Sequence, residues 1–178
     1  KVMEEPPEGV LFLLTADSLA GVLPTIRSRC VSFAIAPVSP ADCARYCTAH
    51  GVDKKTAALY SELFDGHIGT VLTAARDKAR TEQVDKAMEL ARAAQAGDSY
   101  TAAVLLAPYE KDKAGAAALL RDLRAVAAAG LQGSPPAPVQ GQQAQRTLRL
   151  AEAAIQRLGA QVNPKIVLTV FAARLAHA

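Results

Sequence analysis

The chain has 178 residues, of which 51% are hydrophobic but only 4% are aromatic, and its formal net charge is +3. The scarcity of aromatic residues and the mild charge argue against a protein that binds nucleic acid by stacking bases on exposed rings. Its longest apolar runs fall far short of the ~20 residues that a membrane-spanning helix needs, and three cysteines do not make a disulfide framework. We therefore expect a soluble, cytoplasmic protein that does not act on membranes.

The first 36 residues predict two strands with a short helix between them. Residues 10–16 form an apolar run typical of a buried parallel strand, and residues 31–35 alternate apolar with small or polar side chains. Two strands do not make a stable sheet by themselves. We expect this chain to be a fragment whose remaining strands precede residue 1, so that the two strands are poorly supported without them.

The stretch Pro24–Cys30 places two arginines near the end of that short helix. Arg27 and Arg29 are two residues apart, which suits a surface better than a core. One interpretation is that they offset the helix dipole and bind the last carbonyl oxygens. The other is an arginine finger, a guanidinium that stabilises the charge on the γ-phosphate in a neighbour's nucleotide site. The residues alone leave both interpretations open.

A unit of three helices is predicted at about residues 38–79. Ser39 is a plausible cap for its first helix and Asp53 for its second, and the third is expected from about residue 68 to 78. A charged helix at residues 81–96 follows.

The rest of the chain predicts a bundle of four or five helices. One helix is indicated by apolar residues at a spacing of three or four, namely Leu119, Leu120, Leu123, Val126 and Leu131. Residues 132–143, rich in proline, glycine and glutamine, are predicted to be a surface loop. A last helix is expected to start at Asn163 and Pro164. The predicted fold is mainly α, in three parts: residues 1–36, 37–96 and 97–178.

Two further groups of residues have a functional and a structural interpretation. Cys43, Cys47 and His50 share one helical face and resemble zinc ligands, but no fourth ligand is near, which favours small buried thiols. Four basic residues at positions 111, 113, 121 and 124 could face DNA, but such residues on amphipathic helices more often form a solvated face.

Residues 4–8 (Glu-Glu-Pro-Pro-Glu), 12–15 (Phe-Leu-Leu-Thr) and 23–30, ending in Ser-Arg-Cys, resemble the end of the nucleotide-binding domain in bacterial clamp-loader subunits. These are AAA+ proteins of the DNA polymerase III complex. The resemblance implies that residues 1–36 are the remnant of an α/β AAA+ domain. It also implies that residues 37–96 form a helical lid, and that residues 97–178 belong to the helical collar that holds the ring of subunits together.

The same resemblance implies roles for individual residues. Arg29, within Ser28-Arg29-Cys30, would be the arginine finger that is supplied in trans, with Arg27 in the same motif. Thr15 occupies the position called sensor 1. ATP and its magnesium ion would then be bound by a neighbouring subunit, and no cofactor or metal is expected in this fragment.

A second motif separates subunit types. Hydrolysing members of the family carry Gly-Ser-x-Arg-x-x-Leu at the third lid helix, whereas residues 66–72 here read Gly-His-Ile-Gly-Thr-Val-Leu. Gly69 thus stands at the sensor 2 position, where the arginine is missing. A structural interpretation also holds: Gly66 and Gly69 would cap the helix and allow close packing.

A subunit that keeps the trans arginine but lacks its own sensor 2 arginine resembles the delta-prime, or stator, subunit. This implies a role in DNA replication without intrinsic catalysis, within a holoenzyme that is a nucleotidyltransferase. The partners would be the gamma/tau and delta subunits and, through the complex, the sliding clamp and primed DNA. The alternatives are a gamma/tau-type ATPase or another AAA+ motor and, from a different class, a helical DNA-binding module.

Overall fold

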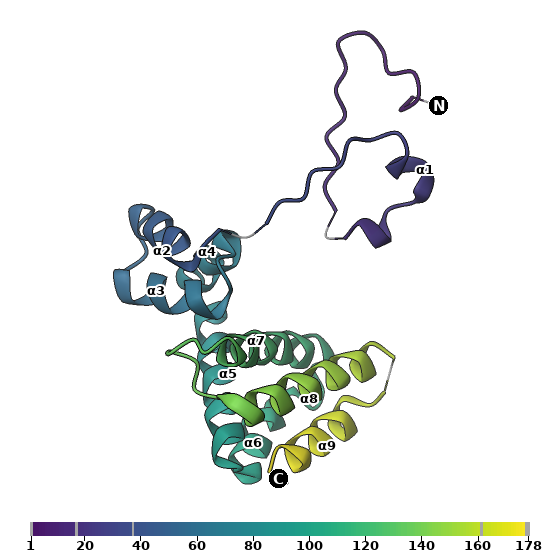
Figure 1. The fold of residues 1–178 in the computed structure, drawn as a ribbon. Helices are drawn as coiled ribbons and strands as arrows, with labels where there is room; N and C mark the ends of the chain where they lie inside the picture. The colour runs from purple at the N-terminus through teal and green to yellow at the C-terminus, as the bar shows by residue number, and fades with distance from the viewer. Residues whose placement is uncertain (1, 17, 37, 161, 177–178) are drawn as a thin grey trace. The chain divides into compact units, whose positions relative to one another are not determined.

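A computed structural model of the chain describes residues 2–16, 18–36, 38–160 and 162–176 (Figure 1). The chain divides into two compact units, Lys1–Ala36 and Pro37–Ala178. The described residues are mainly helical, which confirms the predicted class, and none of them forms a strand. No helix within these ranges is both long and apolar enough to cross a bilayer.

The first unit contains only a 3-10 turn, η1 (Leu19–Gly21), and a one-turn helix, α1 (Pro24–Arg27). The strands predicted at residues 10–16 and 31–35 are not formed in its described residues, so the prediction of strands was wrong, whereas the expectation that these segments are poorly supported by themselves is confirmed. A strand requires a partner for its backbone N–H and C=O groups, and neither segment has one here. None of the described residues between 2 and 36 is buried.

The second unit begins with the three helices that the sequence predicts, followed by a long one. They are α2 (Pro40–Ala49), α3 (Lys54–Leu63), α4 (Ile68–Arg76) and α5 (Lys78–Ala96). The Ser39 hydroxyl accepts a hydrogen bond from the Asp42 N–H at 3.1 Å, and the Asp53 carboxylate accepts two at 3.0 Å, which confirms both caps. Helix α5 starts three residues earlier than predicted because Asp77 caps it.

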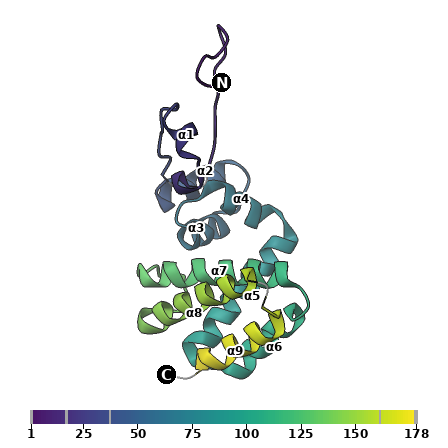
Figure 2. The same cartoon turned by 90° about the vertical axis from the view of Figure 1, so that its right-hand side faces the viewer.

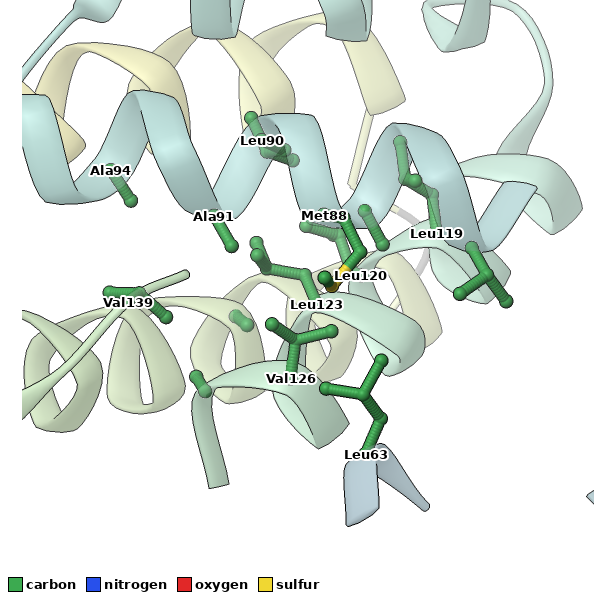
Figure 3. Packing of buried hydrophobic residues seen from close by; sticks show 14 of the residues in the cluster. Leu63, Met88, Leu90, Ala91, Ala94, Leu119, Leu120, Leu123, Val126 and Val139 are labelled. Carbon is green, nitrogen blue, oxygen red and sulfur yellow. The ribbon is translucent and has the colours of Figure 1, made fainter. Parts of the chain in front are cut away.

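The remaining elements are α6 (Ser99–Leu106), η2 (Ala107–Tyr109), α7 (Lys113–Leu131), α8 (Gly141–Gly159) and α9 (Pro164–Ala176). Helices α7 and α8 lie side by side over most of their length, and α9 packs against α6 and α8 (Figure 2). Leucine, valine and alanine side chains from α5, α7 and α8 fill the core between them (Figure 3). The division of this unit into a lid at 37–96 and a collar at 97–178 stays a prediction, because both parts share one core.

The segment predicted as a surface loop, residues 132–143, differs from the prediction in two ways. Helix α8 already starts at Gly141, and the Val139 side chain is fully buried. The Gln140 side-chain amide donates to the carbonyl oxygens of Ser134 at 3.0 Å and Ala137 at 2.9 Å, which closes the segment on itself. Proline and glycine mark where the chain turns, but they do not indicate whether the turn packs against a helix.

Candidate functional site

Arg29 lies just beyond the C-terminal end of α1, where two groups of its own unit hold its guanidinium. Its Nη1 donates to the Thr25 carbonyl oxygen at 2.7 Å, and its Nη2 forms an ion pair with the Glu4 carboxylate. The Ser28 hydroxyl donates to the same Thr25 carbonyl at 3.2 Å. Arg29 therefore makes the contact with a helix carbonyl that the first interpretation predicts. Arg27 is also exposed, and its side chain makes no hydrogen bond with the described residues.

The Arg29–Glu4 pair is open to solvent. The side chain of Arg29 is 37% exposed and that of Glu4 is 46% exposed. Ion pairs at this level of exposure contribute about 0–1 kcal/mol, because water screens them and side-chain entropy opposes them. The pair is thus weak enough for another anion to take the place of Glu4.

A shallow depression of about 360 Å³ surrounds this pair. It is lined by Val2, Met3, Glu4, Thr25, Ile26 and Arg29. The arginine supplies its positive charge and the glutamate its negative charge. An arginine has five N–H donors in a planar fork, and the two contacts of Arg29 leave donors free for an oxyanion.

The other residues expected at this site are less tightly placed. Thr15 is exposed, and the described residues show no hydrogen bond between it and the segment 24–30. Cys30 is an exposed free thiol. The structure therefore brings Glu4 to Arg29 but does not assemble Thr15 with them.

The two glycines of the second motif have different surroundings. Gly66 has φ +71°, and a Cβ there would lie 1.8 Å from the Val38 carbonyl oxygen, so the structural interpretation of a close approach is confirmed. Gly69 lies in the first turn of α4, and no atom is within 4 Å of an added Cβ. Close packing is therefore the wrong explanation for Gly69, which faces open space.

Cys43 and Cys47 are the small buried thiols that the sequence favours. Both are fully buried in α2, and this burial, with Cys43 beside it, raises the pKa of the Cys47 thiol to about 11. The His50 ring stacks on Tyr46 at 3.9 Å between centroids and bonds the Tyr46 carbonyl oxygen at 2.8 Å. Within the described ranges, no three metal-ligating side chains come together.

The four basic residues of α7 and the turn before it are exposed, as expected of a solvated face. A buried charge, Asp122, lies on the opposite face of α7 and pairs with Arg80 on α5; neither residue was predicted to be part of a site. The available signal was an acidic residue between Leu120 and Leu123, at a position where the helical periodicity predicts burial.

Residues 1–39 match the protein family described as DNA polymerase III, delta subunit. No curated protein and no solved structure matches the chain. The matched segment covers the whole first unit, including Glu4, Thr15 and Arg29. The first unit is thus similar to part of a family of DNA polymerase III subunits.

Proposed function

We propose that this chain is part of a delta-prime-type subunit of the bacterial clamp loader, in the cytoplasm, where it supports ATP-dependent loading of the sliding clamp on primed DNA. The family match over residues 1–39, which contains Ser28-Arg29-Cys30, carries this proposal. Residues 1–36 would complete an AAA+ nucleotide-binding domain, and the helices after them would form the lid and the collar. The collar would join the gamma/tau and delta subunits.

The proposed task of Arg29 is to enter the nucleotide site of a neighbouring subunit. Charge spreads over the γ-phosphate oxygens during hydrolysis, and a guanidinium stabilises it because it stays charged and binds two oxygens at once. The position of Arg29 supports this role: the Thr25 carbonyl orients the guanidinium, which is still reachable from solvent. Glu4 would hold the guanidinium until a phosphate group replaces it.

The glycine at position 69 supports the proposal that this chain does not hydrolyse ATP itself. The first turn of the third lid helix is where a hydrolysing subunit would place its sensor arginine, and here the position has no side chain. The open space around Gly69 shows that packing does not explain the glycine. We infer that ATP and its magnesium ion are bound by the neighbour and that this chain has no intrinsic catalysis; a gamma/tau-type ATPase is the alternative.

The test is ATP hydrolysis by a clamp loader reconstituted with the complete subunit. Arg29→Ala should slow hydrolysis at the adjoining site by roughly 10³-fold, the lower range for loss of an arginine finger. Assembly, followed by size-exclusion chromatography, should not change. The matched control is Arg27→Ala, which removes an exposed arginine two residues away and should keep wild-type turnover. Wild-type turnover in both variants would remove Arg29 from the mechanism.

A second variant separates the finger from a purely intrachain ion pair. If Arg29 serves only to hold Glu4, then Glu4→Gln should reduce ATP turnover as much as Arg29→Ala. If Arg29 acts on a neighbour's phosphate, Glu4→Gln should leave turnover within about fivefold of wild type, because the exposed pair contributes at most about 1 kcal/mol. A shared loss in the two variants would contradict the proposed role.

A further inference from the structure

Helices α6 and α9 lie side by side in the second unit (Figure 2) and have few charged residues. Helix α6 contains none, and the charges of α9 are Lys165 and Arg174, near its two ends. The exposed positions of α5, α7 and α8, by contrast, include charged side chains such as Glu82, Arg121 and Arg149. A helix that is apolar on all sides is typically covered on all sides, which is not the case for α6 and α9 here.

A groove of about 360 Å³ lies between these two helices. Most of the residues that line it are small or apolar, among them Ala103, Ala107 and Ala172. Larger apolar side chains are exposed on the same two helices: Tyr100 (78%), Val104 (53%), Ile166 (58%) and Val170 (38%). The groove and these side chains, which we call the α6–α9 face, form an apolar surface that is open to solvent in the single chain.

Charges stand only at the two ends of the α6–α9 face, and their signs differ between the helices. Acidic residues flank α6, with Asp98 before it and Glu110 just after η2, whereas the charges of α9 are the basic Lys165 and Arg174. Lys165 pairs with Glu110 at 3.2 Å within the chain, so α6 and α9 run antiparallel. Hydrogen bonds from the Thr101 hydroxyl and N–H lower the pKa of Asp98, which is therefore charged at neutral pH.

We propose that a second copy of this chain covers the α6–α9 face, and that the two copies are related by a two-fold axis parallel to these helices. This axis places α6 of each copy on α9 of the other, so that acidic ends meet basic ends. Asp98 then lies opposite Arg174 of the second copy, and Glu110 lies opposite its Lys165. A two-fold axis across the helices would instead bring α6 onto α6 and place Asp98 opposite Glu110, which repel each other.

The α6–α9 face is self-complementary in shape as well as in charge. In the proposed pair each Tyr100 lies over the small residues Ala172 and Ala173 of the other copy. The four helices form a bundle in which neighbours are antiparallel, a common arrangement of α-helices. Because the centre of the face is uncharged, pairing leaves no charge buried without a partner. The proposal goes beyond the clamp-loader function and does not depend on Arg29.

The direct test is the mass of the full chain in solution, measured by sedimentation velocity from about 1 to about 100 μM, where interfaces of modest size associate. The average mass should rise from that of one chain toward that of two. Val104→Glu should raise the dissociation constant at least about tenfold, because it puts a carboxylate into the apolar centre of the interface. If this variant associates as the parent does, the copies meet elsewhere and the proposal is overturned.

The matched control is Leu131→Glu, which places the same charge at the end of α7, where the side chain is 46% exposed. It should keep the dissociation constant of the parent. An equal weakening by Leu131→Glu and Val104→Glu would mean that any added charge opposes association, and it would refute the α6–α9 face as the interface. Circular dichroism checks that each variant is folded.

A charge exchange tests the orientation of the two copies. Glu110→Lys alone puts two lysines opposite each other at the interface, and Lys165→Glu alone puts two glutamates there, so each variant should associate more weakly than the parent. In an equimolar mixture each lysine meets a glutamate of the other copy. The mixture should therefore associate at least about fivefold more tightly than either variant alone. A mixture no tighter than its components would refute the proposed axis.

Two further outcomes separate this proposal from the proposed function. A parent chain that stays monomeric at about 100 μM would overturn the pairing of copies. If Val104→Glu then also fails to enter a reconstituted clamp loader, another subunit covers the α6–α9 face. Arg29→Ala should leave the dissociation constant of the pair unchanged, because Arg29 lies outside this face. Loss of pairing in Arg29→Ala would place the interface in the first unit and contradict the proposal.

Discussion

The two units of this protein differ in what they contain: the first has the functional motif, and the second has the hydrophobic core. In the described residues of the first unit no side chain is buried, whereas the second unit has a continuous core of leucine, valine and alanine. The Ser-Arg-Cys motif lies in the first unit, and the family match covers that unit and ends three residues beyond it, at residue 39. A specific motif can thus lie in a segment that does not build a core, while a well-packed bundle of helices carries few motifs.

The physical reason for this contrast is the placement of apolar residues. Leu11, Leu13, Phe33 and Ile35 are all more than 80% exposed, so they gain no stabilisation from burial within their own unit. Under the proposed function, further strands of a nucleotide-binding domain would cover them. The helices of the second unit need no such partner, because each buries its apolar face against a neighbouring helix.

Truncating a leucine should lower the free energy of unfolding strongly in the second unit and hardly at all in the first. Leu123 is fully buried on α7, and Leu123→Ala should lower the free energy of unfolding by about 2–5 kcal/mol, since a cavity adds to the lost burial. Leu13→Ala makes the same chemical change at a side chain that is 85% exposed, and the free energy of unfolding should stay within about 0.5 kcal/mol. Urea denaturation followed by circular dichroism measures both. A similar loss in both variants would abolish the contrast.

Thiol reactivity should also separate the units. Burial raises the pKa of Cys47 from 9.0 to about 11, which lowers its thiolate fraction near pH 8 about a hundredfold. Cys30 is exposed, so a disulfide reagent should modify one thiol quickly in the native chain and the other two only after unfolding. Rapid modification of all three thiols under native conditions would show that the core around α2 is open.

The two glycines allow a finer comparison within the second unit. Gly66→Ala should cost about 1–3 kcal/mol, because its φ is +71° and the new Cβ would meet the Val38 carbonyl. Gly69→Ala should instead raise the free energy of unfolding by about 0.5 kcal/mol, because alanine favours a helix and has open space there. A loss of stability in Gly69→Ala would mean that packing does require this glycine.

Local chemistry was the part of the fold that the sequence could predict. Ser39 and Asp53 cap their helices as expected, and Asn163 does so as well, accepting from the Lys165 N–H at 2.9 Å. The errors come from partners that are distant in the sequence. The segments 10–16 and 31–35 have a strand's composition but no strand beside them.

The candidate site shows the same limit. The motif identified Arg29, but its ion-pair partner Glu4 is 25 residues away, and nothing in either segment specifies that pairing. Arg80 and Asp122, separated by 42 residues, were missed for the same reason. Only the acidic residue on the buried face of α7 pointed to a buried charge.

Amide hydrogen exchange along the chain tests most directly the claim that the motif-bearing unit has no core of its own. We expect residues 10–16 and 31–35 to exchange at nearly unprotected rates, while α5 and α7 are slowed by several orders of magnitude, as buried helices are. Protection of residues 10–16 comparable to that of α7 would contradict the account, because it would show that the first unit is stably folded by itself.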